Sequence, residues 1–256
     1  MINEYAIDPE VIISWAQDQK DSRYFKEAFG FARGRLLSGF LKNELRKSFR
    51  LAHSSLPQND LKELVELYAR LTEKTIKRKG VQKEPGIWLE NAVKEHRRFP
   101  FRAIITKENP KYLPSTFTEK ELLEPNCAEW RIEDTFEFQR THIGMARALY
   151  SILSMCQSIK FVDPYLGVFH KGYKKSFSEF FKILYQARPV GPLTGPVEIH
   201  TSDEKSAQRD LLRERIENVL PSEGEVIVYL WENLDRNPQL HNRFILTDLG
   251  GVRFGH

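Results

Sequence analysis

A histidine, an arginine and an aspartate stand close together near the end of the sequence, at His241, Arg243 and Asp248. The intervening residues favour a strand, in which alternate side chains share a face, so His241 and Arg243 should point the same way. A turn after the strand can fold Asp248 back toward them. Phosphodiester cleavage can use such a set: the imidazole attacks phosphorus, the guanidinium binds the non-bridging oxygens, and the carboxylate orients its partner. The alternative is a hydrogen-bonded histidine at a strand start beside a structural Arg243–Asp248 ion pair.

The elements before this stretch alternate regularly between helix and strand. Hydrophobic periodicity predicts helices over 136–157, 177–187 and 203–220, and strands over 159–162, 197–200, 225–230, 240–246 and 252–254. Gly250 and Gly251 form a tight turn that joins the last two strands into a hairpin. This order predicts an α/β domain with a mixed sheet over residues 136–256.

The first 98 residues show mostly helical spacing of apolar side chains. Asp8 is a suitable N-cap and Pro9 a suitable first helical residue. We therefore predict a helical N-terminal region over 1–98. A connector over 99–135 follows, with a short strand at 99–106 and several prolines after it. The fold class is α/β, or α+β overall, and the helical region is a candidate site for a protein partner.

The spacing of His241, Arg243, Asp248 and Gly255 resembles the His-x-Lys-x4-Asp-x6-Gly-Ser motif of the phospholipase D superfamily. The order of elements over 136–256 is also similar to that family's half-domain. Two residues differ from the motif: Arg243 replaces the lysine, and His256 replaces the serine. The family usually continues with another strand and helix after the motif, so we expect the domain to extend beyond His256.

The resemblance implies a phosphodiesterase that needs no metal or cofactor and forms a covalent phosphohistidine at His241. Gly255 and His256 would then contact phosphate. Because the family works with two facing motifs and this chain has one, the resemblance also implies a homodimer with two His241 side chains across a two-fold axis.

Other residues are candidates for contacts with substrate or phosphate: Asp163, Tyr165, Lys171 and Lys174. Asp163 and Tyr165 follow a predicted strand, where the alternative is a plain turn. The lysines lie in a basic group, and the alternative is a solvated face. His200 ends the next predicted strand. Trp231 is interpreted as a core residue, with stacking on a base as the alternative.

Composition narrows the functional classes. The chain has 256 residues, 41% of them hydrophobic, and a formal net charge of +4. It shows no secretory signal and no run of about 20 apolar residues that could span a membrane. Cys127 and Cys156 favour reduced thiols in a cytoplasmic protein.

We therefore expect a nuclease acting on DNA or RNA. By resemblance alone, it would belong to a bacterial DNA-processing or anti-phage (antiviral defence) system. The alternative is a catalytically weak or inactive nucleic-acid-binding subunit of a larger complex. A lipid phosphodiesterase ranks below both, and no metal or membrane partner is expected.

Overall fold

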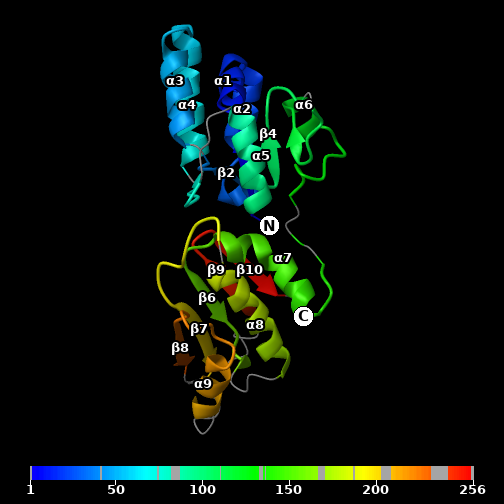
Figure 1. Cartoon of the computed structure of the whole chain (residues 1–256), viewed down its shortest axis with the longest axis vertical. Helices are drawn as coiled ribbons and strands as arrows, with labels where there is room; N and C mark the ends of the chain where they lie inside the picture. The colour runs from blue at the N-terminus through cyan, green and yellow to red at the C-terminus, as the bar shows by residue number, and fades with distance from the viewer. Residues whose placement is uncertain are drawn as a thin grey trace. The chain divides into compact units, whose positions relative to one another are not determined.

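The computed structural model describes residues 2–40, 42–73, 75–81, 87–109, 111–132, 135, 137–166, 171–186, 188–202, 209–231 and 242–254. The chain forms two compact units, Met1–Thr135 and Phe136–His256. Each unit contains a five-stranded sheet with helices interleaved along the chain (Figure 1). The protein is thus an α/β protein with one all-parallel and one mixed sheet.

The first unit is built on the parallel sheet, whose strand order is β3-β2-β1-β4-β5. Its strands are β1 (Asn3–Ile7), β2 (Arg35–Ser38), β3 (Thr75–Ile76), β4 (Ala103–Ile105) and β5 (Thr116–Phe117). The helices are α1 (Pro9–Gln17), α2 (Gln19–Ala28), α3 (Lys42–His53), α4 (Gln58–Thr72), α5 (Trp88–Arg98) and α6 (Glu119–Leu122), with a short 3-10 turn at Phe31–Arg33. This strand order is that of a doubly wound sheet.

Alternate residues of β1 enter two different cores, which shows that the sheet is covered on both faces. Tyr5 and Ile7 belong to a large cluster with residues of α1 and α4, such as Trp15 and Leu67. Ala6 belongs to a smaller cluster with residues that include Phe101. Because side chains alternate along a strand, the two clusters must lie on opposite sides.

The predicted helical N-terminal region is therefore wrong, because β1, β2 and β3 lie within residues 1–98. A parallel strand buried on both faces reads as a short continuous apolar run, which periodicity cannot separate from a buried helix segment. Leu36 and Leu37, assigned to a helix from the sequence, are buried residues of β2. The strand predicted at 99–106 is confirmed by β4, and the region expected to be a connector holds β5 and α6.

The second unit has the mixed sheet, with strand order β10-β9-β6-β7-β8. Its strands are β6 (Ile159–Val162), β7 (Val197–Ser202), β8 (Val226–Trp231), β9 (Arg243–Thr247) and β10 (Gly250–Phe254). Strands β6, β7 and β8 are parallel, and β9 runs antiparallel to both β6 and β10. The helices are α7 (His142–Met155), α8 (Lys171–Tyr185) and α9 (Arg209–Glu217). The predicted mixed sheet and terminal hairpin are confirmed.

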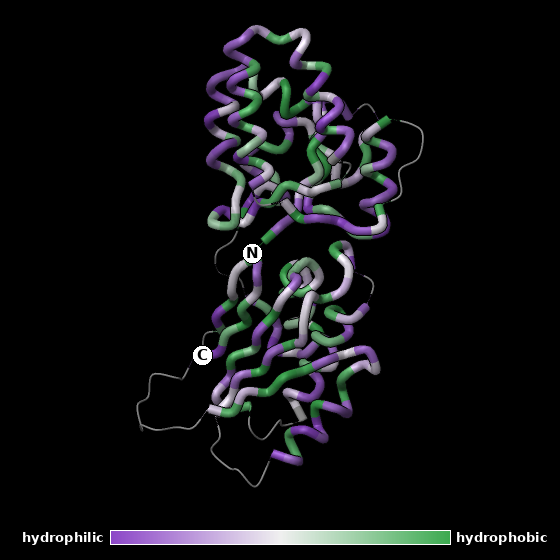
Figure 2. Tube along the Cα trace, turned by 90° about the vertical axis from the view of Figure 1, so that its left-hand side faces the viewer, coloured by the Kyte–Doolittle hydropathy of each residue, from purple (hydrophilic) through white to green (hydrophobic). Residues whose placement is uncertain are grey.

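The two faces of the mixed sheet differ in burial. Val197, Ile199 and Thr201 of β7 are buried, while the residues between them are only partly so. Phe161 of β6 packs against Phe177 of α8, so the buried face is the one that α8 covers. The alternation of hydrophobic and hydrophilic positions can be followed along the trace in Figure 2. None of the helices in the described ranges is long and apolar enough to cross a membrane.

Candidate functional site

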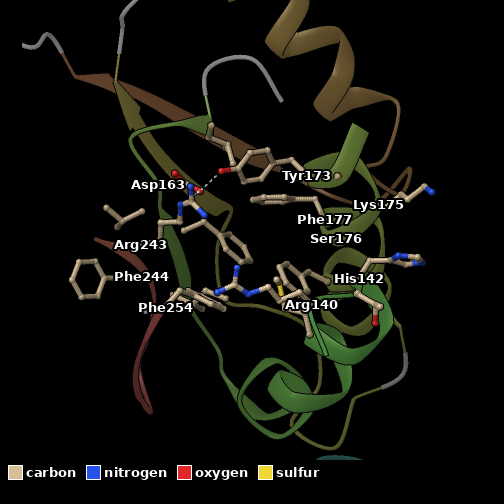
Figure 3. A pocket seen from close by; sticks show the side chains of 18 of the residues that line it. Arg140, His142, Asp163, Tyr173, Lys175, Ser176, Phe177, Arg243, Phe244 and Phe254 are labelled. Atoms are coloured by element: carbon tan, nitrogen blue, oxygen red, sulfur yellow. Dashed lines mark hydrogen bonds and ion pairs between the residues drawn. The ribbon is translucent and has the colours of Figure 1, made fainter. Parts of the chain in front are cut away.

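The candidate site lies where β6 ends and β9 begins. The antiparallel register pairs Val162 with Phe244, so the residue after β6, Asp163, lies next to the first residue of β9, Arg243. The Nε atom of Arg243 is 3.4 Å from Oδ2 of Asp163. The sheet register thus brings together a cation and an anion that are far apart in sequence (Figure 3).

Asp163 is buried and held by several hydrogen bonds. Its Oδ1 accepts a bond from the backbone N–H of Tyr165 at 2.9 Å, which forms a tight turn after the strand. Its Oδ2 accepts a bond from the hydroxyl of Tyr173 on α8 at 2.8 Å. Its own backbone N–H donates to the carbonyl of His200 on β7. The carboxylate therefore has a fixed position from which it can orient Arg243.

Tyr173 is kept in its neutral form by this environment. Burial, together with the negative charge and hydrogen bond of Asp163, raises the pKa of Tyr173 above its ordinary value of 10.0. Arg243 opposes this rise only in part. The phenol, protonated at neutral pH like any tyrosine, therefore keeps its proton and its hydrogen bond to Asp163 into the alkaline range as well.

Arg243 keeps donors available for a ligand. Its side chain is 44% exposed, whereas that of Asp163 is 11% exposed. Its Nε atom is buried and faces Asp163, so it is the exposed part of the guanidinium that can meet a ligand. Its guanidinium carbon lies 5.6 Å from the centre of the Tyr165 ring. A guanidinium in this state can bind a phosphate or carboxylate through more than one N–H.

A cavity of about 850 Å³ adjoins the Asp163–Arg243 pair. Its lining includes the apolar side chains Met145, Phe161, Leu166, Phe177, Phe180 and Phe254. Arg140, His142, Tyr173, Lys175 and Arg243 add polar groups (Figure 3). The volume lies in the range of small-molecule sites, and the mixture of apolar walls with a few polar groups is typical of them.

Only some of the predicted site residues lie together in the structure. His241, Gly255, His256 and the side chain of Lys171 lie outside the described residues. Asp163, Tyr165 and Arg243 are brought together. Lys174 is exposed and does not line the cavity, whereas its neighbour Lys175 does. Arg140, which lies just before α7, belongs to no motif and was not predicted as a site residue.

Asp248 does not converge with Arg243. Its Oδ1 accepts hydrogen bonds from the backbone N–H groups of Gln157 and Ser158, at 2.7 and 3.1 Å. These residues precede β6, while Arg243 lies beside the end of β6. The length of β9 separates the two side chains by about 13 Å at 3.3 Å per residue. The expected convergence is therefore not found, and Asp163 is the carboxylate beside Arg243.

Trp231 and His200 also differ from expectation. The side chain of Trp231 is 57% exposed, so its interpretation as a core residue is wrong. Its indole N–H donates to Nδ1 of His200 at 3.1 Å. Nε2 of His200 lies 3.1 Å from Oε2 of Glu198, on the face away from α8. His200 thus interacts with side chains of the open sheet face.

Neither a metal site within the described residues nor a similar protein was found that would bear on this site. No group of three or more His, Cys, Asp or Glu side chains in the described ranges is arranged to hold a metal ion. Comparisons with protein-family models, curated proteins and solved structures find no match for this chain.

Proposed function

We propose that the second unit binds phosphodiesters and cleaves them without a metal ion, with nucleic acid as the substrate. The observation that carries the proposal is Arg243, a half-exposed guanidinium at a cavity whose Nε is held by a buried carboxylate. Because apolar walls adjoin the guanidinium, this site favours an anion that carries organic substituents over a small inorganic anion. A phosphodiester meets both conditions.

The spacing of the sequence motif supports His241 as the nucleophile, two residues before Arg243. In this mechanism the imidazole attacks phosphorus, a P–N bond forms, and the P–O bond to the leaving alcohol breaks. The second His241 of a homodimer protonates the leaving oxygen. The second His241 then takes a proton from water as the water attacks phosphorus, the P–N bond breaks, and both imidazoles return to their starting states.

Arg243 has the same role in binding and in the transition state. Its guanidinium contacts the non-bridging oxygens as negative charge builds up on them. Asp163 orients it from one side, and the neutral hydroxyl of Tyr173 holds Asp163. Arginine does not give up its proton, so Arg243 serves as an electrostatic clamp and not as an acid.

A second candidate function is binding without turnover. It is favoured by the ion pair of Arg243 with Asp163, because a firmly held arginine suits a permanent anion site at least as well as a catalytic one. In that case the chain would be a nucleic-acid-binding or sensing subunit of a larger complex. Cleavage assays separate the two functions.

The test compares cleavage and binding of single-stranded and duplex DNA and RNA in EDTA. We expect His241→Ala to abolish cleavage while retaining binding, because the imidazole acts mainly in the transition state. Arg243→Ala should weaken both, and Arg243→Lys should retain appreciable activity. The matched control is Arg213→Ala, which removes an exposed arginine paired with Glu217 on α9.

Equal cleavage by the wild type and His241→Ala would refute the catalytic assignment. No cleavage by either protein, with binding that Arg243→Ala weakens and Arg213→Ala does not, would establish the binding function instead. Sedimentation of the active protein as a monomer, with no second protein supplying a motif, would contradict the homodimer.

A further inference from the structure

Three aromatic side chains form a row across β7 and β8: Tyr229, His200 and Trp231. The ring centres of His200 and Tyr229 are 4.6 Å apart, with an interplanar angle of 10°. Those of His200 and Trp231 are 5.9 Å apart, with an angle of 17°. His200 pairs directly with Tyr229 in the strand register, so the row follows from the sheet itself.

This aromatic row lies on the sheet face that α8 does not cover. His200 alternates with buried Ile199 and Thr201 along β7. Trp231 is 57% exposed and Tyr229 is 39% exposed. Trp15 and Trp130, by contrast, are buried in the core of the first unit. A large flat ring left in water forgoes the free energy of burial, which marks the face as a binding surface.

A chain of polar contacts fixes the exposed indole. Lys160 Nζ lies 2.9 Å from Glu198 Oε2, the same oxygen lies 3.1 Å from His200 Nε2, and Trp231 Nε1 donates to His200 Nδ1. Because an indole N–H can only donate, Nδ1 of His200 accepts, and the ring proton sits on Nε2 facing Glu198. The ring edges are thus satisfied, and the exposed aromatic surface is held in place before any ligand arrives.

The line of paired residues through His200 continues across the sheet, through Val162 and Phe244, to a cation. In the strand register His200 pairs with Val162, Val162 with Phe244, and Phe244 with Arg253. Paired residues share a face, and Figure 3 shows the ring of Phe244 directed away from the other labelled side chains. Arg253 is exposed at the far end. The open face therefore carries aromatic rings in line with a positive charge.

We propose that this face binds single-stranded nucleic acid, whose unpaired bases stack on Trp231 and Tyr229 while Arg253 contacts the backbone. Every base has a flat π face, so stacking on aromatic side chains next to cations is the usual way to hold a single strand. In a duplex the base faces are hidden. The inference deepens the proposed function by naming its substrate class, and it rests on that function only for the cleavage step.

Nucleic acid fits this face better than a second copy of the chain or another protein. The cores of protein interfaces are depleted of charged residues, whereas Lys160 and Glu198 lie beside the row, the lysine with its side chain 49% exposed. Trp231 also ends β8 at the same end of the sheet at which β9 begins with Arg243, three strand spacings or about 14 Å away at 4.8 Å each. Arg243 alternates with Phe244 along β9 and so lies on the opposite face of the sheet, which means that a strand bound to the row reaches Arg243 only by passing around this end of the sheet.

The test measures binding of a labelled oligothymidylate to the full chain in EDTA, with an abasic oligomer of the same length as the second probe. Trp231→Ala should weaken oligothymidylate binding at least about fivefold and leave binding of the abasic oligomer unchanged. Trp231→Phe should restore most of the affinity, because a phenyl ring still stacks. Tyr150→Ala, which removes an exposed tyrosine of α7, is the control and should change neither.

Equal affinity of wild type and Trp231→Ala for oligothymidylate would overturn the proposal, as would equal binding of both probes by the wild type. A shift from dimer to monomer in sedimentation of Trp231→Ala would also overturn it, because the face would then join two copies. Loss of oligothymidylate binding in Trp231→Ala, with no cleavage by the wild type, would support the stacking surface and refute the phosphodiesterase.

Discussion

The carboxylate of Asp248 accepts a hydrogen bond from the backbone N–H of Gln157, with 2.7 Å between oxygen and nitrogen. The same oxygen accepts a second bond from the N–H of Ser158 at 3.1 Å. The turn between β9 and β10 is thereby attached to the start of β6. The aspartate of the motif is a structural anchor, at the opposite end of β9 from Arg243.

Replacement of Asp248 should affect stability and not anion binding. Asp248→Ala leaves two backbone N–H groups without their charged acceptor, so we expect a loss of about 1–3 kcal/mol in the free energy of unfolding. Asp248→Asn keeps an oxygen acceptor and should lose less. Urea denaturation measures the change, and phosphate binding by the folded fraction should match the wild type. A stable Asp248→Ala protein that no longer binds phosphate would place Asp248 in the site.

Much of the second unit could be predicted because its signals are local. The strand at Ile159–Val162 and the terminal hairpin follow from residue type and spacing alone, although the turn lies at Asp248 and Leu249, and Gly250 and Gly251, predicted to form it, are the first residues of β10. The partner of Arg243 could not be predicted in this way. The register between β6 and β9 brings Asp163 to it, and no local pattern specifies that register.

The strands of the first unit were harder to predict from the sequence, for a different reason. Its strands are short and buried on both faces, and β1 and β2 contain polar residues such as Glu4 and Ser38 beside apolar ones, with no alternation of the two kinds. The exposure of Trp231 was not predicted because residue type alone favoured burial. Tryptophan is buried in most proteins, and only its pairing with His200 shows why this one is held at the surface.

Asp163 should control the ionisation of Tyr173. Burial and the Asp163 carboxylate both raise the pKa of Tyr173 above 10.0. Asp163→Asn removes the charge but not the burial, so the pKa should fall toward its ordinary value without reaching it. NMR of isotope-labelled tyrosine follows the titration, with Tyr173→Phe assigning the resonance. An unchanged titration in Asp163→Asn would show that burial alone sets this pKa.

The buried arginine of the first unit should be essential for its stability. Arg78 bonds to Glu4 at 2.7 Å and to Glu95 at 2.9 Å, and all three side chains are at most 5% exposed. Arg78→Met leaves the buried carboxylate of Glu4 without its partner and Glu95 with Arg98 alone, which should cost about 3–5 kcal/mol. Arg213→Ala removes an exposed pair with Glu217 and should cost under about 1 kcal/mol. Similar urea midpoints for the two variants would contradict the assigned role.

Cys156 should make the protein less stable at alkaline pH. Burial raises the pKa of this thiol from 9.0 to about 12, and the nearby Arg188 opposes the rise only in part. The folded state therefore holds the proton more tightly than the unfolded state. This stabilising contribution is complete below pH 9 and is lost as the pH rises toward 12, with a slope of up to about 1.4 kcal/mol per pH unit.

Cys156→Ala lacks this titration, so its free energy of unfolding should fall less steeply above pH 9 than that of the wild type. Burial also raises the pKa of Tyr5, to about 12, but that contribution is present in both proteins and cancels in the comparison. Urea denaturation at a series of pH values gives the two slopes. The variant's lower stability at neutral pH, expected from the small cavity, shifts its curve without changing the slope. Parallel curves between pH 9 and 11 would show that the thiol does not ionise on unfolding as proposed.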